Sequence, residues 1–484
     1  MNFGVLSNVI GNILMILSVL IVPSIGVSIY HRGLDLIPLV FTAILTLGVG
    51  IVLKGIKPKE KNIKTKDALL IVVLGWITVS IFGAIPFLLS GVIASPIDAI
   101  FEVVSGFTTT GSTILTDIES LPNGLLFWRS STHWIGGMGI LVFTLALLPS
   151  LGIGGFQIFK AESPGPVASK ITPKMVDTAK SLYKIYILIT VVLFVLLFVG
   201  GMNFEDAAIH TFGVVGTGGF SNKNASVAHF DSTYIHIVIS VFMVICGTNF
   251  GLFYNLFNGK KGYFKYDDEF KAYIKIIGFA IVLISINLFF TVYDKSLLAV
   301  RDATFQATSI ISTSGFVTAD YDLWPTFSKF ILFILMIIGS SAGSTAGGLK
   351  IIRIVVIFRI IKKEIIKVVH KRAVVPVKIN GKNLDEETVS GITAYLGMYF
   401  ICMLIGTAII SLEQIDLMSA ISTSITALSN VGPGFGMVGA TANFAWLSNL
   451  SKITMTLLML LGRLEFFTIV VLLAPRSWRR GEDN

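Results

Sequence analysis

The sequence predicts an all-α polytopic membrane protein with ten transmembrane helices, two in an N-terminal pair and eight in four similar helix–loop–helix units. Composition is the first reason: 54% of the 484 residues are hydrophobic and 13% are charged, about half the charged share of a soluble domain. Runs of about 20 apolar residues, the length at which an α-helix crosses a bilayer, occur throughout the chain. The third reason is a short polar loop with a glycine that returns four times between such runs.

The recurring loop follows a short apolar segment that begins near an aspartate. In the first copy Asp98 begins the segment, and the loop is Thr108–Thr113. The four aspartates are Asp98, Asp206, Asp302 and Asp416, and the loop glycines paired with them are Gly111, Gly218, Gly315 and Gly432. The steps from aspartate to glycine are 13, 12, 13 and 16 residues. A period of about 100 residues between the copies indicates an internal repeat.

The apolar runs place the elements in order along the chain. We expect the N-terminal pair at residues 5–30 and 36–55. Each unit then adds a long helix, a short half-helix, the polar loop and a second long helix. The long helices are expected at 68–92 and 125–150, 180–203 and 232–257, 272–293 and 327–360, and 388–411 and 448–474. The corresponding regions are 1–60 for the pair and 61–155, 156–260, 261–375 and 376–484 for the four units.

The distribution of basic residues predicts the orientation in the membrane, because Lys and Arg are enriched in cytoplasmic loops. The expected cytoplasmic segments are 54–66, 160–184, 258–275, 350–382 and 476–484. They hold 29 of the 37 Lys and Arg residues. This asymmetry predicts that both termini are cytoplasmic and that the half-helices enter from the outer side. The first 30 residues lack a basic start, so we expect no cleavable signal peptide.

Two features of the fourth basic segment have structural interpretations. Residues 350–376 alternate between basic and apolar character. They form either a helix that runs on and lies at the lipid headgroups or a docking surface for a cytoplasmic partner. Residues 374–383 predict a small hairpin with Asn380-Gly381 at its turn, the dipeptide that two-residue hairpin loops favour.

The four polar loops point to ion chemistry. A half-helix of about 10–13 residues reaches only roughly 15–20 Å and cannot cross the membrane. Non-helical backbone at membrane depth is tolerated only where it is buried in protein or lines a water-filled path. A ring of backbone carbonyls can replace the hydration shell of a monovalent cation, and glycine lets the backbone adopt the required conformation. The alternative, that these loops are simple turns, fits one loop far better than four in register around one central pore.

The loops supply a set of candidate filter residues. They are Thr109, Thr110 and Gly111 in the first loop; Gly216, Thr217 and Gly218 in the second; Thr313, Ser314 and Gly315 in the third; and Asn430, Val431 and Gly432 in the fourth. In this register the second loop has Gly216 where the first has Thr109 and the third has Thr313. Side-chain hydroxyls are therefore not shared by all four loops, and we expect the glycine and the backbone carbonyls to be the common element.

A glycine-rich stretch interrupts the second long helix of the third unit and is a candidate gate. It consists of Gly339, Ser340, Ser341, Ala342, Gly343, Ser344, Thr345, Ala346, Gly347 and Gly348. Two interpretations remain open. The stretch is either a close-packed interface of small residues on an unbroken helix or a broken helix whose loop lies beneath the filter as a movable gate.

Arg463 is the second candidate for control of ion passage. It lies about 15 residues into an apolar run, at a depth where a charge is expensive and usually faces a water-filled cavity. There it would repel cations in the pore. The alternative is an arginine that extends to the membrane interface.

Several other function classes are disfavoured. The net charge of +9 arises in the loops, which argues against nucleic-acid binding. Cys246 and Cys402 lie in apolar runs and are expected to be inert. His133 and His210 are expected to be satisfied by hydrogen bonds, because no His/Cys/Asp/Glu cluster suggests a metal site. The long apolar spans also lack the paired carboxylates or Ser/His set of an intramembrane enzyme, so we expect no enzyme activity.

Four such units with one filter glycine each resemble the Trk/Ktr/HKT superfamily of potassium transporters over nearly the whole chain. The motifs that resemble its bacterial TrkH branch are the pair at 5–55, residues 133–139, Pro164-Gly165-Pro166, the loop 339–348, residues 430–434 and Gly462-Arg463. The resemblance implies that Gly111, Gly218, Gly315 and Gly432 are filter glycines. It also implies that 339–348 is an intramembrane gating loop and that Arg463 lies under the filter.

The resemblance further implies a subunit that translocates K⁺ in a bacterial potassium uptake system, with no organic cofactor on this chain. It implies a multi-pass protein in the inner membrane that works as a homodimer. A cytoplasmic ring of TrkA-like nucleotide-binding subunits would gate it, and no nucleic acid would take part.

The coupling of transport remains open at this stage. One alternative is a symporter driven by H⁺ or Na⁺, and another is a less selective pathway for monovalent cations. The expected long spans carry no acidic residue clearly on the conduction path, where a proton relay would need one. We therefore favour channel-like passage.

Overall fold

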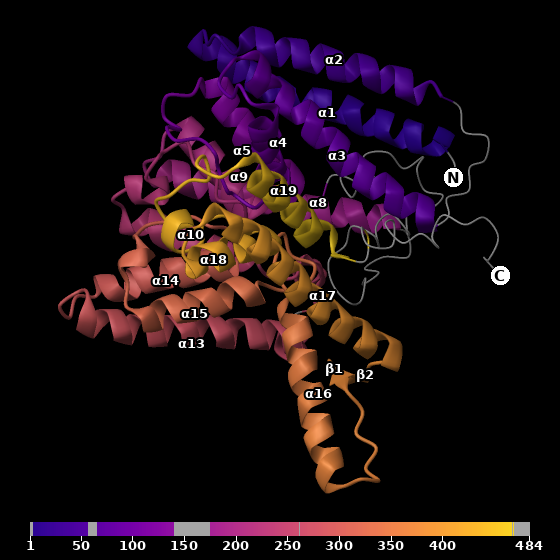
Figure 1. The fold of residues 1–484 in the computed structure, drawn as a ribbon, viewed down its shortest axis with the longest axis vertical. Helices are drawn as coiled ribbons and strands as arrows, with labels where there is room; N and C mark the ends of the chain where they lie inside the picture. The colour runs from indigo at the N-terminus through magenta and orange to yellow at the C-terminus, as the bar shows by residue number, and fades with distance from the viewer. Residues whose placement is uncertain (1–2, 57–64, 140–174, 261, 467, 469–484) are drawn as a thin grey trace.

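The computed structural model describes residues 3–56, 65–139, 175–260, 262–466 and 468 of the chain. The described part is a bundle of helices, with one two-stranded hairpin beside a projecting helix (Figure 1). Six helices of this part are long and apolar enough to cross a membrane, and a seventh span results if one bent pair is counted as a single span. Many large apolar side chains remain exposed on the outside of the bundle, as expected for a surface that faces lipid.

Six long helices lie where the apolar runs predict them. They are α1 (Phe3–His31), α2 (Leu36–Lys54), α3 (Thr65–Leu89), α8 (Met175–Val199), α13 (Asp268–Thr291) and α17 (Glu386–Ile410). Two further helices begin where expected, α5 (Asn123–Gly137) and α19 (Asn449–Leu464). The expected continuation of α5 beyond residue 139 lies outside the described residues, as does most of the expected continuation of α19.

The expectation of one unbroken span at 232–257 is wrong. The segment forms α10 (Thr233–Cys246) and α11 (Phe250–Phe257), bent by 92° at a short break. Asn249 starts the second helix, because its side chain accepts a hydrogen bond from the backbone N–H of Gly251 at 2.8 Å. Gly247 is required at the break, since a Cβ there would lie 2.2 Å from the hydroxyl oxygen of Tyr273.

The second long helix of the third unit is also broken. It consists of α15 (Thr326–Ile338) and α16 (Ile351–Val369), separated by residues without helical structure. This result favours a broken helix at 339–348 over a close-packed helix interface. Figure 1 shows that α16 runs across the direction of α13 and α15 and projects from the bundle. Strands β1 (Lys378–Ile379) and β2 (Lys382–Asn383) lie beside it and form the predicted hairpin around Asn380 and Gly381.

Four short helices precede the four polar loops. They are α4 (Pro96–Phe107), α9 (Phe204–Gly216), α14 (Leu298–Ile311) and α18 (Leu417–Ser429). Their lengths of 12, 13, 14 and 13 residues agree with half-helices. Asp98 and Asp206 lie in the first turns of their helices and Asp416 is an N-cap. Asp302 lies deeper, in the second turn, where it accepts a hydrogen bond from the Tyr293 hydroxyl.

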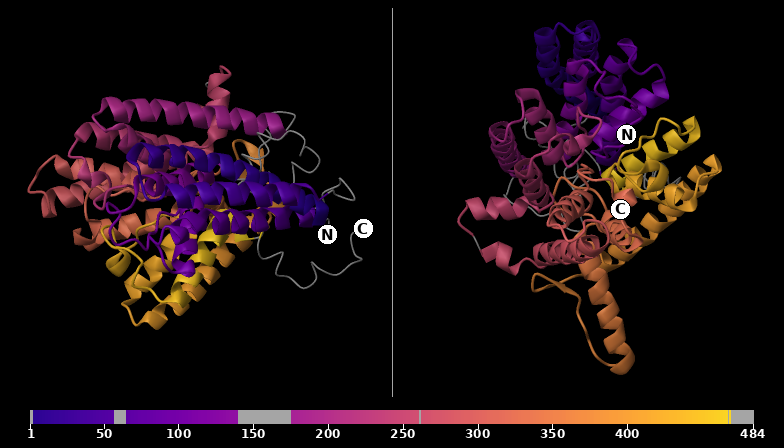
Figure 2. Two further views of the ribbon diagram at one scale, coloured as in Figure 1. Left: turned by 90° about the horizontal axis from the view of Figure 1, so that it is seen from above. Right: turned by 90° about the vertical axis from the view of Figure 1, so that its left-hand side faces the viewer.

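The half-helices pack in a cyclic order. The helix α5 contacts α9 of the next unit, α10 contacts α14, α15 contacts α18, and α19 contacts α4. The second long helix of each unit therefore supports the half-helix of the following unit, and the last supports the first. The pair α1–α2 lies outside this arrangement, against α3 and α5 (Figure 2).

The remaining elements are short. They are α12 (Gly262–Tyr266), η2 (Ser226–His229), η3 (Tyr321–Leu323), η4 (Ser411–Glu413) and η5 (Gly436–Val438). Both cysteines are free thiols, with Cys246 buried and Cys402 partly buried.

Candidate functional site: a ring of four loops

The four loops share one backbone conformation. The first residue of the pattern is a non-glycine residue in the left-handed region: Thr109, Thr217, Thr313 and Asn430, with φ of 57°, 56°, 56° and 55°. Two residues later comes a glycine with positive φ: Gly111, Gly219, Gly315 and Gly432, at 86°, 82°, 70° and 100°. Because left-handed backbone favours glycine, the third position of the pattern depends on that residue type.

This geometry corrects the register of the second loop. The glycine equivalent to Gly111 is Gly219 rather than Gly218, and the residue equivalent to Thr109 is Thr217 rather than Gly216. The step from Asp206 to its glycine therefore becomes 13 residues, as in the first and third loops. The sequence could not decide this point, because the loop contains three glycines and only the backbone conformation distinguishes them. Threonine thus occupies the left-handed position in three loops, and the expected departure at Gly216 does not exist.

The glycines and the neighbouring carbonyls close a ring. A Cβ added at Gly111 would lie 2.1 Å from the carbonyl oxygen of Gly218 in the second loop. The same relation repeats around the ring. An added Cβ would lie 2.1 Å from the Ser314 carbonyl oxygen at Gly219, 2.2 Å from that of Val431 at Gly315, and 2.7 Å from that of Thr110 at Gly432. Each glycine therefore lies against the carbonyl that precedes the glycine of the next loop. A side chain at any of these glycines would displace that carbonyl.

The side chains at the left-handed positions are held by local bonds. The hydroxyls of Thr109 and Thr217 donate to the preceding carbonyls at 2.7 and 2.6 Å. The Asn430 amide donates to the Thr110 hydroxyl at 2.9 Å and to the Met459 carbonyl at 3.0 Å. The bond from Asn430 to Thr110 ties the fourth loop to the first.

Further contacts join the segments that follow neighbouring loops. The Asn224 side chain accepts from the backbone N–H of Ile118 at 2.8 Å and donates to the Asp117 carboxylate at 2.9 Å, which joins loops one and two. This amide holds the pKa of the Asp117 carboxyl below its ordinary value. The other junctions are Ala228 N–H to Val317 carbonyl at 3.0 Å, Tyr321 hydroxyl to Gly434 carbonyl at 2.9 Å, and Phe444 N–H to Thr113 carbonyl at 2.8 Å.

The candidate gate lies directly against this ring. The backbone N–H of Gly347 donates to the Thr313 hydroxyl at 2.8 Å. A Cβ at Gly347 would lie 2.2 Å from the Ser429 carbonyl oxygen, one residue before Asn430. The residues of 339–348 are buried or partly buried, so the stretch fills space inside the protein.

Glu269 holds the two ends of this stretch together. One carboxylate oxygen of Glu269 accepts from the backbone N–H of Ala342 at 2.7 Å and from that of Ile352 at 3.0 Å. The first bond fixes the start of the loop and the second fixes the start of α16. Sequence reasoning missed this residue, although a carboxylate in the first turn of a long apolar helix is an available signal.

Arg463 links the gate to the first unit. Its guanidinium donates to the carbonyls of Thr345 at 2.7 Å, Gly136 at 2.6 Å and Gly137 at 2.7 Å. The two glycines form the end of α5, so the charge rests on the negative end of that helix. Arg463 thus lies next to the loop, with its guanidinium hydrogen-bonded to carbonyls of two other segments. Glu465 pairs with Arg353 of α16 at 2.5 Å.

The two histidines near the loops are held by hydrogen bonds. The His133 ring lies 2.7 Å from the Gly106 carbonyl, and the His210 ring lies 2.9 Å from the Ser221 hydroxyl. Within the described residues no group of three or more His, Cys, Asp or Glu side chains could hold a metal ion.

A family model described as TrkH, a cation transport protein, matches residues 40–480 of the chain. The chain belongs to the TrkH family. The Trk system potassium uptake protein TrkH of Escherichia coli is 37% identical, over 99% of this chain and 100% of that relative. The corresponding protein of Halomonas elongata is 36% identical over the same shares. The crystal structure of the potassium transporter TrkH from Vibrio parahaemolyticus matches with a TM-score of 0.88 and 33% identity, over 99% of this chain and 100% of that chain.

Membership in the TrkH family confirms the expected class of protein. The family consists of cation transport proteins, so the chain is a transporter rather than an enzyme. The apolar helices agree with a multi-pass membrane protein.

Proposed function

We propose that this chain carries K⁺ across the bacterial inner membrane, through a filter formed by the four loops. The observation that carries the proposal is the closed ring in which each loop glycine lies against the carbonyl of the next loop. Four similar backbones in cyclic order present equivalent carbonyls, and rings of carbonyls can replace the hydration shell of K⁺. The relatives from Escherichia coli and Halomonas elongata are potassium uptake proteins, which supports K⁺ as the transported ion.

The stretch 339–348 is the gate of this pathway, and Arg463 holds it in place through hydrogen bonds. The loop lies against the inner edge of the third and fourth filter loops through Gly347. Arg463 fixes it to the end of α5 by three bonds to carbonyls. Hydrogen bonds from a charged group contribute about 1.5–3 kcal/mol each, so the loop stays in place until another contact in the protein changes.

The proposal also covers the division of the chain into units, its oligomeric state and its cytoplasmic partner. The chain is divided into an N-terminal pair at 1–60 and four units at 61–155, 156–260, 261–375 and 376–484, and the recurrence of a half-helix and a polar loop in each unit supports this division. The chain acts as a homodimer with one pore in each copy, and a TrkA-like nucleotide-binding ring controls the gate from the cytoplasm. The basic segments support both termini on that side. The start of α1 and the end of α2 lie at the same end of the bundle, as an antiparallel pair requires (Figure 1).

Channel-like passage fits the buried glutamates better than coupled symport. Glu102 is paired with Arg129 at 2.7 Å. Glu269 accepts two backbone N–H groups. Both carboxylates therefore have fixed structural partners, whereas a proton relay needs a group that releases its partner in each cycle.

Rubidium flux into liposomes that contain the purified chain alone tests the proposal. Gly111→Ser and Gly315→Ser should each reduce flux strongly, because the new side chain displaces a ring carbonyl. Gly278→Ser is the matched control, since a Cβ at this glycine of α13 meets nothing within 4 Å. Normal flux in both filter variants would overturn the proposed pathway.

A further inference from the structure

A fully buried ion pair, Glu102–Arg129, contacts both of the first two loops. The Arg129 Nε lies 2.7 Å from the Glu102 Oε1, with side chains 2% and 0% exposed. Glu102 comes from the half-helix α4 and Arg129 from α5. Buried charges persist only when they are paired and hydrogen-bonded, so the remaining partners of both groups indicate what this pair does.

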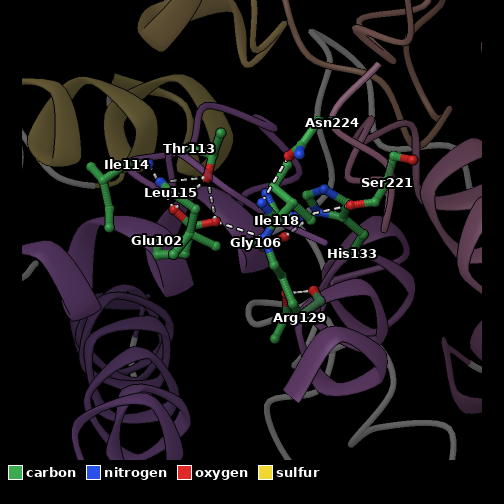
Figure 3. A network of polar contacts seen from close by, with 11 residues as sticks. Glu102, Gly106, Thr113, Ile114, Leu115, Ile118, Arg129, His133, Ser221 and Asn224 are labelled. Carbon is green, nitrogen blue, oxygen red and sulfur yellow. Dashed lines mark hydrogen bonds and ion pairs between the residues drawn. The ribbon is translucent and has the colours of Figure 1, made fainter. Parts of the chain in front are cut away.

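Glu102 holds the first loop. Its two carboxylate oxygens accept from the Thr113 hydroxyl at 2.9 and 3.0 Å, and one of them accepts from the backbone N–H of Ile114 at 2.9 Å. Thr113 lies two residues after Gly111. Figure 3 shows the Thr113 hydroxyl and the backbone N–H of Ile114 directed at the Glu102 carboxylate, which Arg129 also contacts. The carboxylate therefore fixes the chain where it leaves the filter.

Arg129 reaches the second loop. Its Nη1 donates to the Ser221 carbonyl at 3.0 Å. Its guanidinium lies 3.5 Å from the centre of the Phe220 ring, a contact that a planar cation favours. Phe220 also stacks on His133, with ring centres 4.0 Å apart. Phe220 and Ser221 directly follow Gly219, so the arginine fixes the second loop at the corresponding point.

The other loops have no ionic equivalent of this link at the same position. Glu102 lies nine residues before its loop glycine, and the matching residues are His210, Gln306 and Thr423. His210 contacts the Ser221 hydroxyl of its own loop at 2.9 Å. Thr423 donates to the Ser419 carbonyl of its own helix at 2.6 Å. Of these four positions, Glu102 alone carries a charge and continues through a partner into the next loop.

We propose that Glu102 and Arg129 are positioning residues that set the spacing between the first and second filter loops and thereby the choice between K⁺ and smaller cations. This inference rests on the proposed function. Neither side chain belongs to the ring of carbonyls, so both act through the loops that they hold. Separation of the two side chains would leave unpaired buried charges, which is costly. The pair therefore stays together and holds the two loops at a fixed spacing.

The test compares K⁺ and Na⁺ flux ratios in liposomes for the wild-type chain and the Glu102→Gln/Arg129→Gln variant. This double change removes both charges together, so no unpaired ion remains. We expect the K⁺/Na⁺ ratio to fall by about tenfold, which corresponds to ~1.4 kcal/mol. The matched control is Asp98→Asn/Lys452→Gln. It removes another ion pair of α4, at 2.8 Å, whose partner lies on α19.

Thermal unfolding of both double variants separates selectivity from stability. The control should lose a comparable amount of stability and keep the wild-type ratio. An unchanged ratio in a folded Glu102→Gln/Arg129→Gln protein would overturn the inference. If that variant fails to fold, Arg129→Lys decides: lysine keeps the charge but lacks the planar fork that bonds Ser221 while covering Phe220. We expect a smaller fall in the ratio, and an unchanged ratio again overturns the inference.

These outcomes are distinguishable from failure of the proposed function. If the wild-type chain carries no K⁺, the pathway itself is wrong. If the wild-type chain is K⁺-selective and the variants are equally selective, only the role of Glu102 and Arg129 is wrong.

Discussion

At the scale of single residues, four glycines with positive φ let the four loops approach one another closely. Gly111, Gly219, Gly315 and Gly432 each lie so close to the next loop that an added Cβ would stand 2.1–2.7 Å from a carbonyl oxygen. Real Cβ atoms do not approach oxygen so closely, and left-handed backbone disfavours other residues by about 1–2 kcal/mol. The spacing of the ring therefore depends on these four positions more than on any side chain in the loops.

The corrected register of the second loop gives a first prediction. Gly219→Ser should reduce rubidium flux by more than about tenfold, ~1.4 kcal/mol, because its side chain would displace the Ser314 carbonyl. The measurement is flux in liposomes, with Gly278→Ser as the control. Wild-type flux and selectivity in the Gly219 variant would show that another glycine occupies the filter position.

Arg463 gives a second prediction at this scale. Arg463→Gln should raise flux severalfold in liposomes, because the shorter neutral side chain cannot hold the Thr345 carbonyl and the end of α5 together. Arg463→Lys separates charge from geometry. If flux in the lysine variant is as low as in the wild type, the positive charge is sufficient. If both variants conduct more, the three hydrogen bonds of the guanidinium are what holds the gate in place. Unchanged flux in both would favour a structural role away from the pathway.

At the scale of elements, the break between α15 and α16 turns one span into a helix, a loop and a projecting helix. Glu269 on α13 holds both ends of the break through a single oxygen. Helix α16 leaves the bundle (Figure 1), and Ile352 near its start shares this carboxylate with Ala342 of the loop.

The Glu269 link gives a third prediction. Glu269→Ala should increase flux through the chain, because the loop 339–348 loses the bonds that fix Ala342 and Ile352. Glu269→Gln is the matched control, since its amide oxygen can still accept both N–H groups. Flux should therefore rise in the alanine variant and stay near wild type in the glutamine variant. Equal behaviour of the two variants would argue against a role as a hydrogen-bond acceptor for the loop.

At the scale of the whole molecule, the cyclic packing of helices closes the ring. The contact of α19 with α4 returns the fourth unit to the first. A chain of four units can form a single pathway only with such a closure, because an open row of loops would leave unpaired backbone at membrane depth.

The orientation of the molecule gives a fourth prediction. In a Cys402→Ser background, a cysteine placed at the exposed Thr116 should react with a membrane-impermeant maleimide in intact spheroplasts. A cysteine at the exposed Lys382 of β2 should react only after the membrane is opened. Labelling of both sites in detergent is the control for reactivity. Labelling of Lys382→Cys in intact spheroplasts would reverse the assigned orientation.

Much of the fold could be predicted because apolar length and turn chemistry are local properties. The helices α1, α2, α3, α8, α13 and α17 follow from runs of apolar residues, and the hairpin follows from Asn380-Gly381. The break at Gly247–Asn249 could not be predicted with the same ease. Its cause is the close approach of Tyr273 and the loop 339–348 from other parts of the chain.

The candidate site shows the same division. Its glycine loops and the residues Arg463 and 339–348 could be selected from the sequence, because small polar residues and a deep charge are unusual in apolar runs. The groups that these residues contact could not be predicted from the sequence. Arg463 bonds carbonyls that lie 118, 327 and 326 residues away along the chain.

The sequence alone determined that this protein is a multi-pass bundle with four glycine loops, since hydropathy and repeat spacing depend only on residue order. Only the tertiary structure decided which glycine of the second loop belongs to the ring, where two spans break, and that Glu102 and Arg129 join two loops. The physical reason is that a left-handed backbone and a buried ion pair are fixed by packing between segments that are distant in the chain, such as Arg129 and Ser221, which are 92 residues apart. No local pattern specifies such packing.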